Sequence, residues 1–127
     1  MAGNLEKDIL DVVLDTLPVE ITFVDENDVV RYYNKNGDRI FPRPPSIIGR
    51  KVQDCHPKKS LHLVNQLLDD FRSNRRDVAE FWIDRQGRKI YIRYFAVRDK
   101  SGRYLGCLEV TQDITELKQI EGEKRLL

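Results

Sequence analysis

Two cysteines and two histidines in this sequence have the side-chain types that bind soft metal ions or carry out thiol chemistry. Cys55, His56 and His62 fall within eight positions, and Cys107 follows much later in the chain. Their spacing matches no structural zinc pattern. Adjacent residues such as Cys55 and His56 point in different directions in regular structure, so both cannot easily reach one ion. The sequence therefore predicts no metal site.

Cys55 is the stronger candidate for thiol chemistry. It precedes His56, Lys58 and Lys59, and positive neighbours favour the thiolate, which is the reactive form. An unreactive loop cysteine is the alternative. Cys107 lies in a predicted strand, where we expect it to pack as a small apolar side chain.

The chain offers little for catalysis or for binding nucleic acid. It contains no nucleophile elbow, no Gly-rich phosphate loop and no paired acids on one face, so we predict that it is not an enzyme. Its 127 residues carry 22 Lys and Arg against 21 Asp and Glu, a net charge of +1, which gives no reason to expect a nucleic-acid surface. The sequence also shows neither a membrane span nor a signal peptide, so we expect a cytoplasmic, one-domain protein with reduced thiols.

Residues 4–17 predict an amphipathic helix at the N-terminus, capped by Asn4 and ended by Pro18. Its apolar stripe is the expected dimer contact. The stripe residues, spaced by three and four positions, are Leu5, Ile9, Val12 and Val13, with Thr16 beyond them.

The following segments predict a sheet interrupted by helices. Alternating patterns indicate a hairpin over 19–25 and 29–33, and three more strands over 77–84, 88–99 and 103–113. A long helix is predicted over 60–73, with Ser60 as its N-cap and a stripe of Leu61, Val64, Leu68 and Phe71. A charged helix is predicted over 115–127. This order indicates an α+β fold with one antiparallel sheet and helices on one face.

The element order and the ending Gly102-Arg103-Tyr104-Leu105-Gly106 … Gln112-Asp113-Ile114-Thr115-Glu116 resemble the PAS domain family over residues 5–118. The resemblance implies a five-stranded antiparallel sheet, a pocket between the sheet and the small helices, and frequent homodimers. On this basis residues 1–17 form a flanking helix, 18–114 the PAS core and 115–127 a C-terminal helix.

Other segments resemble a narrower group, the C-terminal PAS domains that follow a hemerythrin-like (HHE) domain in some bacterial and archaeal proteins. These segments are Phe41-Pro42-Arg43, Asp54-Cys55-His56-Pro57, Glu80-Phe81-Trp82-Ile83 and 121–127. The resemblance implies a hemerythrin-like domain upstream in a longer chain.

Asp113-Ile114-Thr115 lies where the last strand meets the predicted C-terminal helix. The Asp113 carboxylate can accept backbone N–H groups or pair with a base, and Thr115 can cap the helix. The triplet is therefore either a signalling junction or a plain helix cap.

Cofactors known in the PAS family fit this sequence unequally. Flavin-binding members carry a reactive Cys three residues after the Gly of a Gly-Arg pair, and here Val52 stands three residues after Gly49. Flavin is thus not expected. Haem-binding members use a His on the long helix, which makes His62, or His56 just before the helix, the candidate ligand. Haem is therefore the leading candidate if there is a cofactor.

An unidentified small ligand is the other expectation. Arg93 and Tyr94 lie on opposite faces of the predicted fourth strand, and either is a candidate contact. Large side chains on both faces of the sheet indicate that the N-terminal helix or a partner subunit covers the outer face. The sequence thus predicts a dimeric PAS sensor with a small ligand, and a ligand-free dimerisation or docking module is the alternative.

Overall fold

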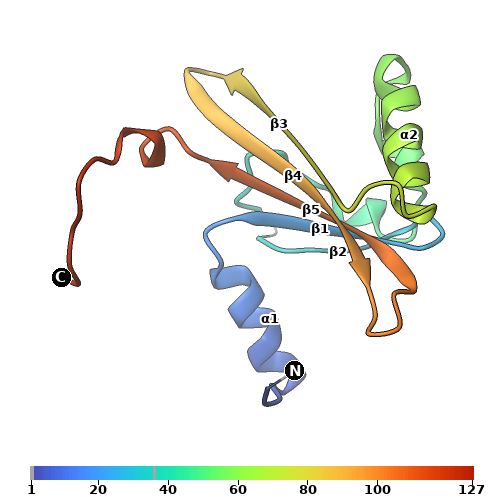
Figure 1. Cartoon of the computed structure of the whole chain (residues 1–127), viewed down its shortest axis with the longest axis horizontal. Coiled ribbons are helices and arrows are strands. Elements are labelled where there is room, and N and C mark those ends of the chain that lie inside the picture. Colours follow the sequence, from blue (N-terminus) through green and yellow to red (C-terminus); the bar gives the residue numbers. More distant parts are fainter. Residues whose placement is uncertain (1, 36) are drawn as a thin grey trace.

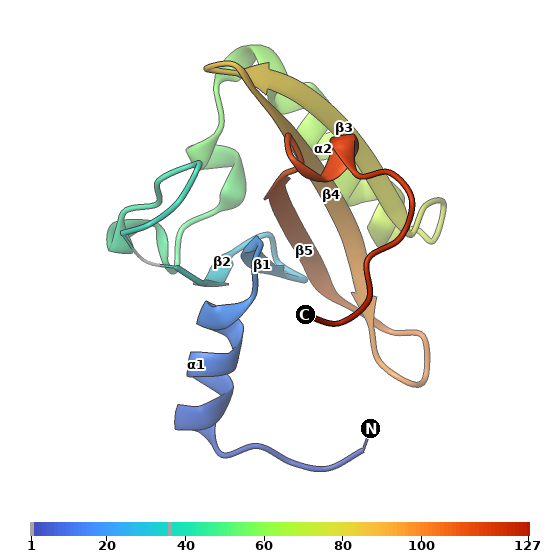
Figure 2. The same cartoon turned by 90° about the vertical axis from the view of Figure 1, so that its left-hand side faces the viewer.

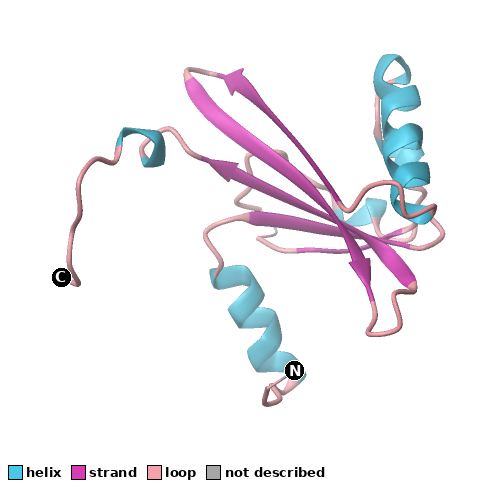
Figure 3. Cartoon of the chain, in the orientation of Figure 1, coloured by secondary structure: helices cyan, strands magenta, loops and turns pink. Residues whose placement is uncertain are grey.

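The computed structural model of the protein describes residues 2–35 and 37–127. The regular elements, coloured by type in Figure 3, are α1 (Lys7–Thr16), β1 (Glu20–Asp25), β2 (Val30–Tyr33), α2 (Leu61–Arg72), β3 (Val78–Arg85), β4 (Arg88–Arg98) and β5 (Tyr104–Asp113). Short 3-10 turns lie at Pro45–Ile47, Val52–Cys55, Lys58–Ser60 and Leu117–Gln119.

The five strands form one antiparallel sheet in the order β2-β1-β5-β4-β3 (Figure 1). Hairpins join β1 to β2, β3 to β4 and β4 to β5. The pairing of β1 with β5 therefore joins the first two strands to the last three. Gly106 makes that pairing possible, because a Cβ atom at this position would collide with the Val24 carbonyl oxygen. The predicted α+β fold with a five-stranded antiparallel sheet is confirmed.

One face of the sheet carries the core. Helix α2 lies against this face (Figure 1). Its Leu68 and Phe71 side chains form a buried cluster with Tyr104 and Cys107 of β5. The helix has an apolar stripe at the spacing that the sequence predicted, and this stripe is the face turned to the sheet. A second cluster joins β1, β2 and the first 3-10 turn, and it consists of Val24, Val30 and Ile47.

Helix α1 leads away from the sheet and covers neither face (Figures 1 and 2). It contains no buried residue. The side chains of the predicted stripe are instead exposed: Leu5 by 53%, Ile9 by 51%, Val12 by 65% and Val13 by 42%. The outer face of the sheet is therefore not covered by α1, and Trp82 on β3 is 61% exposed.

Three local predictions were wrong. No helix forms over 115–127, where only Leu117–Gln119 makes a single turn before the chain runs on outwards (Figure 1). The segment buries no side chain and Gly122 adopts a φ of 62°, so neither packing nor backbone preference supports a helix there. Asn4 and Ser60 also fail as caps: α1 begins after Glu6, and the Ser60 hydroxyl bonds to the Pro57 carbonyl oxygen instead.

Among the residues that the structure describes, no helix has the length and apolar character needed to cross a bilayer.

Candidate functional site

A pocket of about 540 Å³ lies between α2 and the inner face of the sheet. This volume is within the usual range of small-molecule sites. Its walls come from α2, the sheet and the segment just before α2. The lining residues are Val24, Val52, His56, Ser60, Leu63, Val64, Leu67, Leu68, Ala79, Glu80, Phe81, Tyr94, Cys107 and Glu109.

Most of this wall is apolar. Helix α2 turns Val64, Leu67 and Leu68 towards the sheet, because they recur at helical spacing on its inner stripe. Across the pocket, the Phe81 and Tyr94 rings stack with centroids 6.1 Å apart. An apolar molecule would therefore be enclosed on both sides by side chains that gain from excluding water.

One end of the pocket is polar. His56 comes from the segment before α2, Tyr94 from β4 and Glu109 from β5, where Tyr94 and Glu109 are cross-strand partners. The Glu109 carboxylate accepts hydrogen bonds from Arg43 Nη2 at 3.2 Å and from Thr111 Oγ1 at 3.3 Å. Both bonds end on Oε1. Arg43 and Glu109 are mostly buried, with 22% and 14% of their side chains exposed.

Burial keeps this polar end uncharged apart from the Arg43–Glu109 pair. It lowers the pKa of His56, although the Glu109 carboxylate acts in the opposite direction, so the imidazole is neutral at pH 7. Burial, together with Glu109, raises the pKa of Tyr94 and raises that of the Cys107 thiol to about 12. Cys107 is therefore a protonated thiol in the wall, as expected of a core cysteine.

The structure brings only part of the predicted site together. His56 and Tyr94 line the pocket, whereas His62 lies exposed on the outer side of α2 and Cys55 does not line the pocket. Arg93 lies on the opposite face of β4, where its guanidinium contacts the Tyr91 and Phe95 rings at 5.0 and 5.6 Å. Glu109 was missed. Its signal is the strand alternation, which places an acid on the face shared by Cys107 and Thr111.

Within the described residues, no group of three or more His, Cys, Asp and Glu side chains could hold a metal ion.

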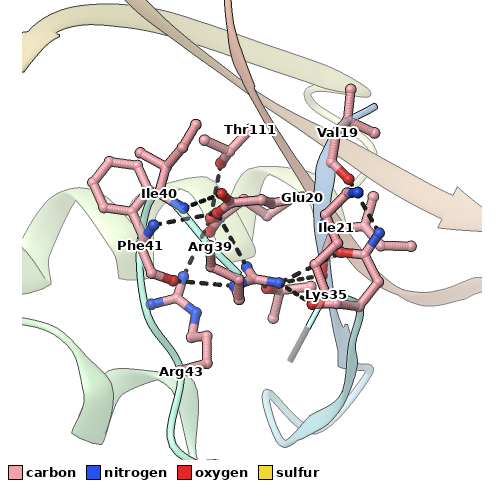
Figure 4. A network of polar contacts seen from close by, with 12 residues as sticks. Val19, Glu20, Ile21, Lys35, Arg39, Ile40, Phe41, Arg43 and Thr111 are labelled. Atoms are coloured by element: carbon pink, nitrogen blue, oxygen red, sulfur yellow. Dashed lines mark hydrogen bonds and ion pairs between the residues drawn. The ribbon is translucent and has the colours of Figure 1, made fainter. Parts of the chain in front are cut away.

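Behind the polar end, residues 39–44 form a Pro-rich segment that leads into the first 3-10 turn. A buried network of polar contacts holds this segment against β1 (Figure 4). Arg39 Nη2 lies 3.7 Å from Glu20 Oε1, and the two side chains are only 1% and 6% exposed. Glu20 also accepts hydrogen bonds from the backbone N–H groups of Ile40 and Phe41. This network fixes the segment that carries Arg43 towards Glu109.

Asn34 extends the same network to α1. Its side-chain oxygen accepts a hydrogen bond from the Ile21 N–H at 2.7 Å, and its NH₂ group donates to the carbonyl oxygens of Leu14 at 2.8 Å and Val19 at 3.1 Å. Arg39 Nη1 in turn donates to the Asn34 carbonyl oxygen at 2.6 Å. The C-terminal end of α1 is thus bound to the same buried cluster as the Pro-rich segment.

The Asp113-Ile114-Thr115 junction ties β5 to the start of β4. Asp113 accepts hydrogen bonds from Arg88 Nε at 2.7 Å and from the Thr115 N–H at 2.9 Å. The Thr115 hydroxyl donates to Asp113 and accepts from the Lys89 N–H at 2.8 Å. The expected helix cap at Thr115 was therefore wrong, because its hydroxyl is used between strands and no helix follows.

Comparison with protein families identifies the class of this fold and site. Residues 10–115 match the family model described as PAS domain, and the chain belongs to that family. A comparison with curated proteins gave no significant match.

Solved structures agree with this membership. The chain is similar to the crystal structure of a C-terminal domain from Streptococcus mutans, with 36% identity over 95% of this chain and 94% of that one and a TM-score of 0.89. A sensory box sensor histidine kinase from Vibrio cholerae has the same fold at 14% identity, with a TM-score of 0.59 over 86% of this chain and 91% of that one. So does the PAS domain of Bordetella pertussis BvgS, at 17% identity and a TM-score of 0.62 over 88% and 90%. The chain thus has the PAS fold, and at these identities the last two structures show a shared fold alone.

The buried Glu20–Arg39 pair predicts a large stability cost for Glu20→Gln. The substitution leaves the Arg39 charge buried without its counter-charge, so we expect the free energy of unfolding to fall by about 3 kcal/mol in urea titrations. Asp11→Asn is the matched control, because it breaks the exposed Lys7–Asp11 pair and is expected to cost less than about 0.5 kcal/mol. Equal losses in the two variants would contradict the assignment.

The junction predicts an unusually acidic Asp113. Its hydrogen bonds from Arg88 and Thr115 lower the pKa of Asp113 from the ordinary 3.8 to about 2. Because the folded-state pKa is the lower one, the contribution to stability is present above 3.8 and is lost as the pH falls towards 2.

NMR titration of the side-chain carboxyl carbon checks this value. Arg88→Gln is expected to raise the pKa of Asp113 towards 3.8, whereas Arg85→Gln removes a nearby charge without a contact to Asp113 and is expected to change it little. A pKa near 3.8 in the unmodified protein would refute the junction geometry.

Proposed function

We propose that this PAS domain is a sensor that binds a small organic molecule in the pocket between α2 and the sheet, and that it forms a homodimer through α1. The observation that carries the ligand proposal is the pocket itself, which has apolar walls and one polar end formed by His56, Tyr94 and Glu109. A core that only filled space would gain nothing from a polar end at this place. We further propose that the domain is cytoplasmic and non-catalytic, in keeping with its free thiols.

The homodimer proposal is supported by α1. Its apolar side chains Leu5, Ile9, Val12 and Val13 lie on one stripe and are all at least 42% exposed. The helix stands clear of the sheet, so a second copy can pack against the stripe without displacing any part of the core (Figure 2). The ligand-free docking module remains the alternative function, and it would use this same stripe.

A haem-based sensor is the second candidate, and His56 is the observation that favours it. His56 lines the pocket and its lowered pKa leaves a neutral imidazole, the form that binds iron. His62 does not fit this role, because it lies outside the pocket. Hemin titration decides: a Soret shift that His56→Ala abolishes supports haem, and no shift, or a shift that survives this substitution, removes it.

The longer context is also a proposal. We propose a hemerythrin-like domain upstream of this one in a longer chain, on the sequence resemblance of segments such as Asp54-Cys55-His56-Pro57. The similar Streptococcus mutans structure is itself described as a C-terminal domain, without a named upstream domain.

The pocket proposal predicts a retained small mass in native mass spectrometry of freshly purified protein. Val64→Trp fills the pocket from α2 and is expected to abolish that mass, since Val64 lines the wall. His62→Trp places the same ring on the outer side of α2 and is expected to leave it unchanged. A bare protein in all three samples would favour the ligand-free module.

The dimer proposal predicts that Ile9→Asn weakens self-association. Losing one buried Ile contact in each subunit is expected to raise the dimer Kd at least tenfold, or roughly 1.4 kcal/mol, as measured by sedimentation equilibrium. Asp8→Asn introduces the same Asn at the neighbouring polar position, and it is expected to leave the dimer Kd unchanged. A monomer at high micromolar concentration in the unmodified protein would refute the proposal.

A further inference from the structure

The pocket wall offers no cation to a ligand. Among its described lining residues there is no Lys or Arg, and His56 is neutral. Arg43 is bonded to Glu109 Oε1 but does not itself line the pocket, so the ligand meets a carboxylate and not a guanidinium. An anionic ligand would lose its hydration and gain no counter-charge in this site.

A cationic ligand meets no unbalanced charge at the polar end either. The Glu109 charge is already balanced by Arg43 at 3.2 Å. Glu80 also borders the pocket, but its carboxylate accepts a hydrogen bond from the Tyr91 hydroxyl, on the other face of the sheet. Moving a cation into apolar walls would therefore cost desolvation without forming a new ion pair.

Glu109 nevertheless keeps hydrogen-bonding capacity on the pocket side. Its bonds from Arg43 and Thr111 both end on Oε1, while each carboxylate oxygen has about two acceptor positions. The Tyr94 hydroxyl is also hydrogen-bonded to Glu109, and its raised pKa keeps it protonated as a donor. With three donors on about four acceptor positions, the carboxylate can still accept one further donor.

From this geometry we infer that the ligand is a neutral, mostly apolar molecule whose polar end carries a hydrogen-bond donor that binds Glu109. This inference rests on the proposed function of the pocket and narrows its ligand class. The ligand lies with its apolar body between α2 and Phe81 and its donor towards β5.

Three probes with the same ring system test the inference: 2-naphthol, 2-methoxynaphthalene and 2-naphthoate. They are respectively a neutral donor, a neutral acceptor without a donor, and an anion. Binding is measured by NMR titration of the backbone amides of α2. We expect 2-naphthol to bind about tenfold more tightly than either of the others, because a hydrogen bond to a charged group contributes about this much.

Substitutions identify the acceptor. Glu109→Gln replaces the carboxylate by an amide that can also donate, so the preference for 2-naphthol over 2-methoxynaphthalene is expected to shrink to about twofold. Glu121→Gln makes the same change in the exposed C-terminal segment and is expected to keep the full preference.

The outcomes separate the inference from the proposed function. Equal binding of the three probes, tighter binding of 2-naphthoate, or a preference that survives Glu109→Gln would overturn the ligand class while leaving the pocket a binding site. Absence of binding by all three probes would overturn the proposed function, and the ligand class with it.

Discussion

The buried Glu20–Arg39 ion pair is the interaction on which the rest of the structure depends. A carboxylate and a guanidinium with 6% and 1% of their side chains exposed are tolerable only if nearly all their hydrogen-bonding groups are used. Here they are used to hold the Pro-rich segment, which has no regular backbone pairing of its own. The Glu20 carboxylate thus binds the N–H groups of Ile40 and Phe41 in a segment where Pro42 and Pro44 have no N–H to donate.

The same cluster sets the relation between the pocket and α1. Through the Pro-rich segment it holds Arg43 against Glu109, which is the polar end of the pocket. Through Asn34 it holds the Leu14 carbonyl oxygen at the end of α1. Pocket and N-terminal helix are therefore anchored to one buried network, although they lie on different parts of the fold.

The C-terminal junction is built on a different principle. Asp113 and Thr115 bond to Arg88 and Lys89 at the surface. These bonds hold the end of β5 to the start of β4 without burying a charge. The chain beyond Leu117–Gln119 packs on nothing in the described structure. Of the two chain ends, the N-terminal one is thus connected to the core through the buried Asn34 side chain, and the C-terminal one is bonded to the start of β4.

Local patterns in the sequence determined the sheet, both long helices and the family. Alternation marked the strands and three-and-four spacing marked α1 and α2, because each pattern gathers apolar side chains on one face of its element. In α2 this face is buried against the sheet, whereas in α1 it is exposed. Strand alternation also pointed to Tyr94, whereas His56 was proposed from its position just before the long helix, by resemblance to haem-binding members. Tertiary structure alone decided the rest. Glu109 and Arg43 are 66 positions apart and meet only because β5 pairs beside β1, and the Glu20–Arg39 pair depends on the same folding of the Pro-rich segment. The C-terminal segment shows the converse: its charged, helix-like sequence forms only one turn, because a short helix needs a packing surface and the fold provides none there.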